Sequence, residues 1–127
     1  EKIPETLLVE KEGKIERDYF EEERAIFFSV KGKGLVIISG CAHRGIVNTV
    51  KQVIKLTGIK KIHAIIGGFH LMGASEERIL KTIEDLKTLS PKYLIPMHCT
   101  GLEPYFLFSQ TIKENLMLNT VGTTYTF

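Results

Sequence analysis

The segment Ser39-Gly40-Cys41-Ala42-His43-Arg44-Gly45-Ile46 separates an apolar run, residues 35–38, from a stretch whose apolar side chains recur at helical spacing. Four consecutive aliphatic residues predict a strand that is buried on both faces. The apolar positions after the segment predict a helix over residues 45–57. Open α/β sheets bind ligands at loops that follow a strand and precede a helix. The segment therefore predicts an α/β fold with a functional loop at a strand end.

Two further strand ends repeat this arrangement. Ile65-Ile66 leads into Gly67-Gly68-Phe69-His70, and Tyr93-Leu94-Ile95 leads into Pro96-Met97-His98-Cys99-Thr100-Gly101. Each time a histidine follows the apolar run within a few residues, beside Gly or Pro. The fourth histidine, His63, lies near the start of its strand and is expected at the opposite edge of the sheet. His43, His70 and His98 are therefore expected at one common edge.

The rest of the chain predicts one domain, residues 1–127, with a mixed β-sheet and flanking helices. We expect a short strand pair at 7–9 and 14–16, a hairpin of 25–30 with 35–39, and further strands at 59–66 and 93–95. Helices are expected from Ser75 to Ser90 and from Glu103-Pro104 through Leu116, and a closing strand at 123–127. The run Glu21-Glu22-Glu23 is interpreted as a solvated face.

Composition narrows the class of protein. The chain has 127 residues, 43% hydrophobic and 25% charged, with a net charge of +2, which argues against nucleic acid or an anionic membrane as partner. No apolar run is long enough for a transmembrane helix, and no secretory signal is visible. Two cysteines without an export signal suggest a reduced, cytoplasmic protein. Abundant Lys, Glu and Ile hint at a thermophile. The missing initial Met suggests a fragment of something longer.

The three loop histidines suggest a metal site. Neutral imidazole is the commonest protein ligand for metals, and three histidines around zinc leave a position for water. Hydrogen-bonded structural histidines are the alternative for each residue. Cys41 and Cys99 each neighbour a loop histidine and are expected close together, as packed thiols, metal ligands, a redox pair or a disulfide. Arg44, at a helix start, is a candidate for binding an anionic substrate, and a solvated arginine is the alternative.

These motifs resemble the second half of the αββα metallo-β-lactamase superfamily of metal-dependent hydrolases. The closest branch is similar to the archaeal dihydropterin ribofuranosylaminobenzene phosphate synthases. The stretch 34–48 resembles that branch's third metal motif, Gly67-Gly68-Phe69-His70-Leu71 its fourth, and Pro96-Met97-His98-Cys99-Thr100-Gly101 its last. The resemblance implies that His43 and His98 are ligands, one for each of two metals, and that zinc is the cofactor. Thr100 is a candidate for a supporting or substrate-binding hydrogen bond.

Two departures qualify the resemblance. His70 falls where most of the superfamily has a bridging Asp, and a histidine cannot bridge two metals as a carboxylate does. The superfamily's HxHxDH motif, which lies in the first half of the fold, occurs nowhere in this sequence. The chain is therefore expected to be a fragment, a subunit completed by another chain, or a degenerate half.

The leading hypothesis is the C-terminal half of a zinc-dependent hydrolase that activates water against an ester or phosphoester. The missing N-terminal half or a second copy of the chain would complete it, and the isolated chain is expected to be weakly active or inactive. The rival hypothesis is a structural or interaction domain that self-associates through an exposed sheet face. A small-ligand or nucleotide-binding module that uses the glycine turns is a third hypothesis, without a P-loop or dinucleotide fingerprint to support it.

Overall fold

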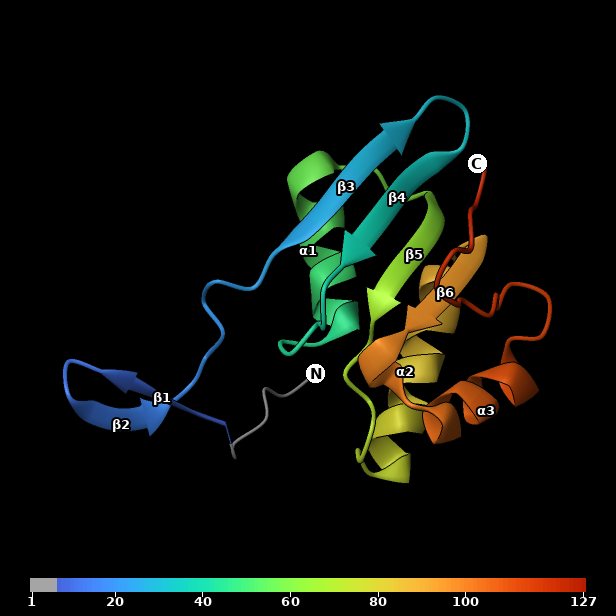
Figure 1. Cartoon of the computed structure of the whole chain (residues 1–127). Coiled ribbons are helices and arrows are strands. Elements are labelled where there is room, and N and C mark those ends of the chain that lie inside the picture. Colours follow the sequence, from blue (N-terminus) through green and yellow to red (C-terminus); the bar gives the residue numbers. More distant parts are fainter. Residues whose placement is uncertain (1–6) are drawn as a thin grey trace.

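The structure, a computed structural model, describes residues 7–127 and contains a four-stranded mixed sheet flanked by helices (Figure 1). The sheet has the order β3-β4-β5-β6 and comprises Ala25–Val30, Gly34–Ser39, Ile62–Gly68 and Tyr93–Met97. β3 pairs antiparallel with β4, while β4, β5 and β6 are parallel. The predicted mixed α/β class is confirmed. The predicted domain bounds include residues 1–6, which lie outside the described residues.

Helices α1 (Ile46–Thr57) and α2 (Glu76–Leu89) cover one face of the sheet, and α3 (Leu102–Thr111) packs beside α2 (Figure 1). Both predicted helix boundaries of α2 have local causes. The Ser75 hydroxyl accepts a hydrogen bond from the Arg78 amide at 3.3 Å, and Pro91 follows the left-handed Ser90 at the other end. The core between helices and sheet is aliphatic, with Ile37 and Ile65 fully buried. No helix within residues 7–127 is long and apolar enough to cross a membrane.

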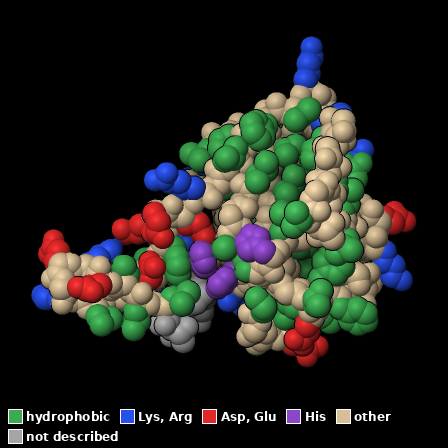
Figure 2. All heavy atoms as spheres, in the orientation of Figure 1, with side chains coloured by type: hydrophobic (Ala, Val, Ile, Leu, Met, Phe, Trp, Pro, Cys, Tyr) green, Lys and Arg blue, Asp and Glu red, His purple; other side chains and the backbone are tan. Residues whose placement is uncertain are grey.

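The opposite face of the sheet is open toward the viewer in Figures 1 and 2, and hydrophobic side chains gather on it. Ile26, Phe28 and Ile38 are 60%, 53% and 37% exposed, although all three lie in strands. Ile38 is therefore less buried than its place in a four-residue aliphatic run predicts. Strands of this sheet thus carry apolar surface that the described chain does not cover.

The hairpin of β1 (Leu8–Lys11) and β2 (Lys14–Arg17) projects from the main body (Figure 1). It confirms the predicted strand pair, shifted by one or two residues. Its apolar side chains are mostly solvent-facing, since Ile15 is 74% exposed. In the segment after the hairpin, Phe20 is buried and stacks on His43.

The C-terminal segment corrects two predictions. The last helix ends at Thr111, not at Leu116, because residues 115–117 pair with β6 instead. Leu94 donates its amide to the Asn115 carbonyl at 2.7 Å and accepts from the Met117 amide at 2.8 Å. The predicted closing strand at 123–127 is wrong, because this pairing already occupies the outer edge of β6.

Candidate metal centre

The loops that follow β4, β5 and β6 meet at one edge of the sheet because the three strands run parallel. Backbone hydrogen bonds join the loops. The Gly68 amide donates to the Gly40 carbonyl at 2.8 Å, and the Cys99 carbonyl accepts from the amides of Leu71 and Met72, both at 3.2 Å. The Thr100 hydroxyl accepts from the Phe69 amide at 3.1 Å. These bonds fix the loops to one another, so side chains on them have defined positions.

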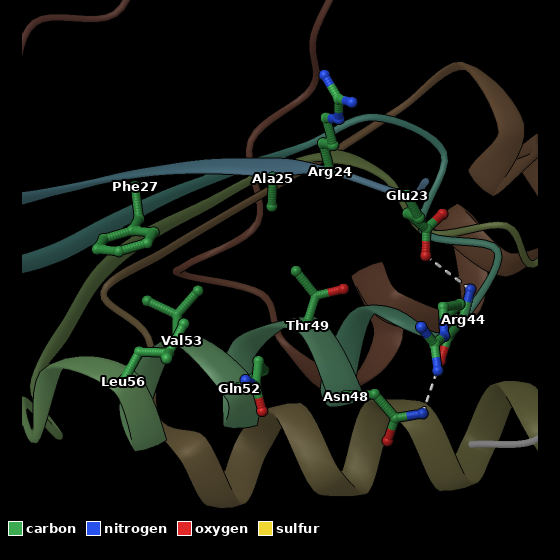
Figure 3. A pocket seen from close by; sticks show the side chains of 10 residues that line it. All are labelled: Glu23, Arg24, Ala25, Phe27, Arg44, Asn48, Thr49, Gln52, Val53 and Leu56. Atoms are coloured by element: carbon green, nitrogen blue, oxygen red, sulfur yellow. Dashed lines mark hydrogen bonds between the residues drawn. The ribbon is translucent and has the colours of Figure 1, made fainter. Parts of the chain in front are cut away.

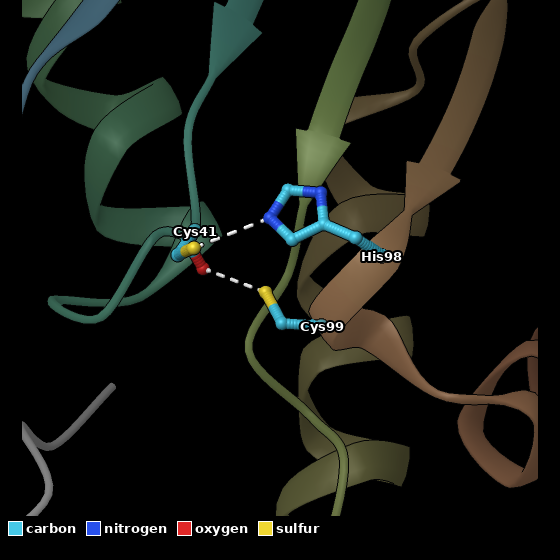
Figure 4. A group of neighbouring side chains, drawn as sticks. All are labelled: Cys41, His98 and Cys99. Atoms are coloured by element: carbon cyan, nitrogen blue, oxygen red, sulfur yellow. Dashed lines mark hydrogen bonds between the residues drawn. The ribbon is translucent and has the colours of Figure 1, made fainter. Parts of the chain in front are cut away.

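One cluster at this edge consists of Cys41, His98 and Cys99 (Figure 4). The Cys41 Sγ and His98 Nε2 lie 3.2 Å apart, and the Cys99 thiol donates to the Cys41 carbonyl at 3.4 Å. The two sulfurs and a ring nitrogen all lie within 4.8 Å of one another. Cys41 follows β4, whereas His98 and Cys99 form the 3₁₀ turn η1 (His98–Thr100) directly after β6. The prediction that the two cysteines lie close together is confirmed.

Glycine at position 68 leaves the space that this cluster occupies. A Cβ added to Gly68 would lie 2.5 Å from the Cys99 Sγ and 2.6 Å from the His98 Nε2. Both distances are far below an ordinary contact of about 3.5 Å. The cluster therefore requires glycine at position 68, the last residue of β5, because any side chain there would occupy the same space.

A second group lies around His43. The carboxylate of Glu23 accepts from the His43 backbone amide, lies 3.1 Å from the His43 Nδ1, and accepts from the Arg44 amide at 2.8 Å. The ring of Phe20 stacks on His43 with 4.4 Å between centroids and an interplanar angle of 11°. A carboxylate on one ring nitrogen fixes an imidazole and makes the other nitrogen a better metal ligand. Glu23 and Phe20 thus fix the orientation of the His43 ring.

His70 lies beside His43, with the ring centroids 4.7 Å apart and at 63°. Burial, together with neighbouring His43 and Arg78, lowers the pKa of His70, against an opposing effect of Glu23. A lowered pKa keeps imidazole neutral near pH 7, which is the form that binds metals. Burial raises the pKa of the Cys99 thiol to about 11, so in the absence of a cation this thiol is protonated.

The structure therefore places the three loop histidines at the ends of parallel strands but divides them between two groups. His43 contacts His70, whereas His98 contacts Cys41. Histidine side chains gather beside one another on the face shown in Figure 2. Their role as ligands stays a prediction. His63 lies near the start of β5, is 5% exposed, and packs its ring against Tyr93 and Phe127 at 5.3 Å each. His63 thus lies at the opposite end of β5 from the loop of His70, as the sequence predicted.

The two predicted substrate contacts differ in their surroundings. Thr100 is 2% exposed, and its hydroxyl accepts a hydrogen bond from the backbone amide of Phe69 in the neighbouring loop. Arg44 is exposed and lines a groove of about 660 Å³ between β3 and α1 (Figure 3). Arg44 and Asn48 lie at one end of the groove, and Phe27 and Leu56 at the other. Substrate binding by either residue stays a prediction.

Sequence reasoning missed Glu23, which it assigned to a solvated acidic run. In the structure its side chain is only 12% exposed. A signal was present, because Ala25 begins the strand that returns to Ser39 in the hairpin. That register brings the residues before Ala25 beside the loop that follows Ser39, which contains His43. The hairpin alone could therefore have placed Glu23 near the candidate ligand.

The chain is similar in sequence to two archaeal proteins and in structure to one solved protein. No family model matches the chain. The 7,8-dihydropterin-6-methyl-4-(beta-D-ribofuranosyl)-aminobenzene-5'-phosphate synthase of Methanocaldococcus jannaschii is 46% identical over 103 residues, 81% of this chain and 35% of the synthase. An uncharacterized protein of the same organism is 35% identical over 112 residues, 88% of this chain and 40% of that protein.

A solved structure also matches. The crystal structure of Tm1679, a metal-dependent hydrolase of the β-lactamase superfamily, has a TM-score of 0.85 and 32% sequence identity over 91% of this chain and 44% of that chain. The chain thus spans less than half the length of each of these proteins. The resemblance noted in the sequence is confirmed, since the chain is a homologue of the synthase and of the hydrolase over the parts that it matches.

Proposed function

Because the chain is a homologue of part of a metal-dependent hydrolase of the β-lactamase superfamily, we propose that it supplies part of a zinc-dependent hydrolytic site. The site lies at the edge of the sheet where the loops after β4, β5 and β6 meet. His43, His70 and His98 are the proposed imidazole ligands. The observation that carries this proposal is the Glu23 carboxylate on the His43 Nδ1, since a carboxylate on one ring nitrogen is the arrangement that orients metal-binding histidines.

A bound zinc ion would supply a Lewis acid that activates water against an ester or phosphoester. The chain's own residues do the positioning. Glu23 holds the His43 ring and the backbone amides of His43 and Arg44, and the Phe20 ring fixes the plane of the imidazole. The exposed Arg44 guanidinium, next to this loop, would attract an anionic small-molecule substrate.

Further polypeptide is proposed to complete the site and to cover the open face of the sheet. The relatives are more than twice as long as the parts that match, so they contain enough additional chain for both tasks. Ile26, Phe28 and Ile38 would be buried by that polypeptide. Additional metal ligands would come from the same source, either as an N-terminal half or from a second copy of the chain.

The test uses the intact protein that carries this sequence. Hydrolysis of bis-p-nitrophenyl phosphate and of p-nitrophenyl acetate is measured with added zinc for the parent, for His98→Ala and for His43→Ala. We expect at least a hundredfold loss of activity in both variants. The control is His63→Phe, which changes a histidine outside the site and preserves its aromatic packing. Full activity of His98→Ala and His43→Ala would refute the proposal.

A non-catalytic interaction domain is a second candidate, favoured by the same exposed apolar face. If this is the function, the face pairs with a second copy of the chain. Sedimentation of the 127-residue chain then shows a concentration-dependent dimer that Ile26→Lys abolishes. A monomer at high concentration excludes this candidate and leaves the hydrolase proposal intact.

A further inference from the structure

The cluster of Cys41, His98 and Cys99 presents a different donor set from the three histidines. Two sulfurs and one imidazole nitrogen form a soft to borderline set, which selects zinc or cuprous copper over magnesium, calcium or manganese. The Cys41 sulfur lies against the His98 ring, and the Cys99 sulfur lies against the Cys41 backbone carbonyl (Figure 4). We propose that Cys41 and Cys99 bind a zinc ion as thiolates together with His98, so that one metal position at this edge, separate from the pair His43 and His70, has sulfur ligands.

The distances suit a small tetrahedral ion. In a tetrahedral zinc site, a sulfur at about 2.3 Å and a nitrogen at about 2.1 Å lie about 3.6 Å apart, and two sulfurs lie about 3.8 Å apart. The Cys41 Sγ and His98 Nε2 are separated by 3.2 Å, and no pair in the cluster is separated by more than 4.8 Å. Each pair therefore needs to move by about 1 Å or less to reach the zinc geometry.

The ligands are held by rigid elements. The Cys99 carbonyl accepts two backbone hydrogen bonds from the loop after β5, and the next residue, Thr100, binds that loop through its hydroxyl. Cys41 lies two residues beyond the end of β4, and the adjacent Gly40 carbonyl is bonded to Gly68. These anchors bring the donors together before an ion arrives, which lowers the entropic cost of binding it.

The cluster is also accessible and has room. His98 is exposed, and both cysteines are partly exposed, so an ion can enter from solvent. Gly68 contributes no side chain to the space between the Cys99 sulfur and the His98 ring. Three protein ligands leave one position of a tetrahedral zinc ion for another group, which is the pattern of catalytic zinc sites. On binding, each thiol releases its proton to solvent.

This inference deepens the proposed function, since both use His98, and its test separates the two. Cobalt(II) is titrated into the reduced chain under anaerobic conditions, because cobalt replaces zinc and cobalt–thiolate bonds absorb strongly in the near ultraviolet. We expect this absorption in the parent and in His43→Ala. We expect it to be lost in the Cys41→Ser and Cys99→Ser variants, with at least tenfold weaker zinc binding.

Two outcomes would overturn the inference. In the first outcome, cobalt binds without the near-ultraviolet band, and its binding is unchanged in both serine variants but lost in His43→Ala. This result would place the ion on histidines alone and would leave the hydrolase proposal standing. A chain that binds no cobalt after full reduction, or whose thiols bind only each other as a disulfide, would exclude a thiolate metal site. Circular dichroism of the serine variants controls for folding, since serine is close to cysteine in size.

Discussion

Replacing Gly68 by alanine should disable the metal centre while leaving the sheet in place. The added methyl group would lie 2.5 Å from the Cys99 Sγ and 2.6 Å from the His98 Nε2. An ordinary contact needs about 3.5 Å, so both donor atoms must retreat by about 1 Å. The φ angle of Gly68 is outside the left-handed region, so alanine adds no backbone strain of its own.

The expected effect follows from the tolerance of metal sites. Ligand distances vary by only about 0.2 Å, so a methyl group that lies between the two donors and keeps them about 1 Å away from it hinders their approach to a common ion. Changes in the immediate surroundings of metal ligands typically weaken affinity by about 10-fold to 100-fold, and we expect at least this loss for Gly68→Ala. The cost in folding free energy should stay within about 1–3 kcal/mol, as for other overpacked sites, because His98 is exposed and can swing outward.

The assay is competition for zinc against a chromophoric chelator, with urea denaturation in parallel. Gly40→Ala is the matched control, because a Cβ there meets nothing within 4 Å. Gly67→Ala is the opposite control. Its φ is +135° and its Cβ would lie 2.1 Å from the Ser39 carbonyl oxygen, so it should destabilise the fold itself. Zinc affinity of Gly68→Ala equal to that of Gly40→Ala would refute the reasoning.

Three further predictions concern other parts of the molecule. Glu23→Ala removes a largely buried acceptor of several hydrogen bonds, so urea denaturation should show a loss of about 2 kcal/mol in the free energy of unfolding. An unchanged free energy of unfolding would contradict the role assigned to Glu23. Burial lowers the folded-state pKa of His63 below its ordinary 6.5, so the unfolded state binds the proton more tightly. Stability should therefore be full above pH 6.5 and fall as the pH drops below it, and His63→Phe should reduce this decline in thermal melts at pH 7.5 and 5.5; an unchanged slope would count against it. If further polypeptide covers the open face as proposed, Ile26→Lys should lower the melting temperature of the protein that includes that polypeptide, because the substitution buries a charge. In the 127-residue chain alone the same substitution should have little effect on melting. Equal effects in the two proteins would exclude a covered face.

The sequence predicted the elements whose signals are local. The aliphatic run before Ser39 and the apolar spacing after Gly45 correctly indicated β4 and α1, and Ser75 correctly marked the start of α2. The end of α3 was wrong because helical spacing continued through Leu116 while a tertiary contact decided the conformation. Residues 115–117 pair with the edge of β6 that no other strand of the sheet occupies. This pairing cannot be predicted from local sequence, because it depends on the order of strands in the sheet.

The location of the candidate residues was predicted, but their grouping was not. Parallel strands force their following loops to one edge, so the common location of His43, His70 and His98 could be read from the pattern. How the side chains group within that edge could not, because it depends on loop conformation. Ala42 and His70 adopt positive φ angles, 53° and 48°, which turn their loops in ways that the residue types do not announce. Glu23 was missed because its role depends on the hairpin register and not on its neighbours in sequence.

Zinc content of the purified 127-residue chain, measured by elemental analysis without chelator or histidine tag, tests the central claim most directly. The account predicts about one zinc per chain, lost in His98→Ala and retained in His63→Phe, because the loops at this edge are already joined by hydrogen bonds. A chain that holds no zinc even after its addition, or that holds the same zinc in His98→Ala, would contradict the claim that these strand ends form a metal centre.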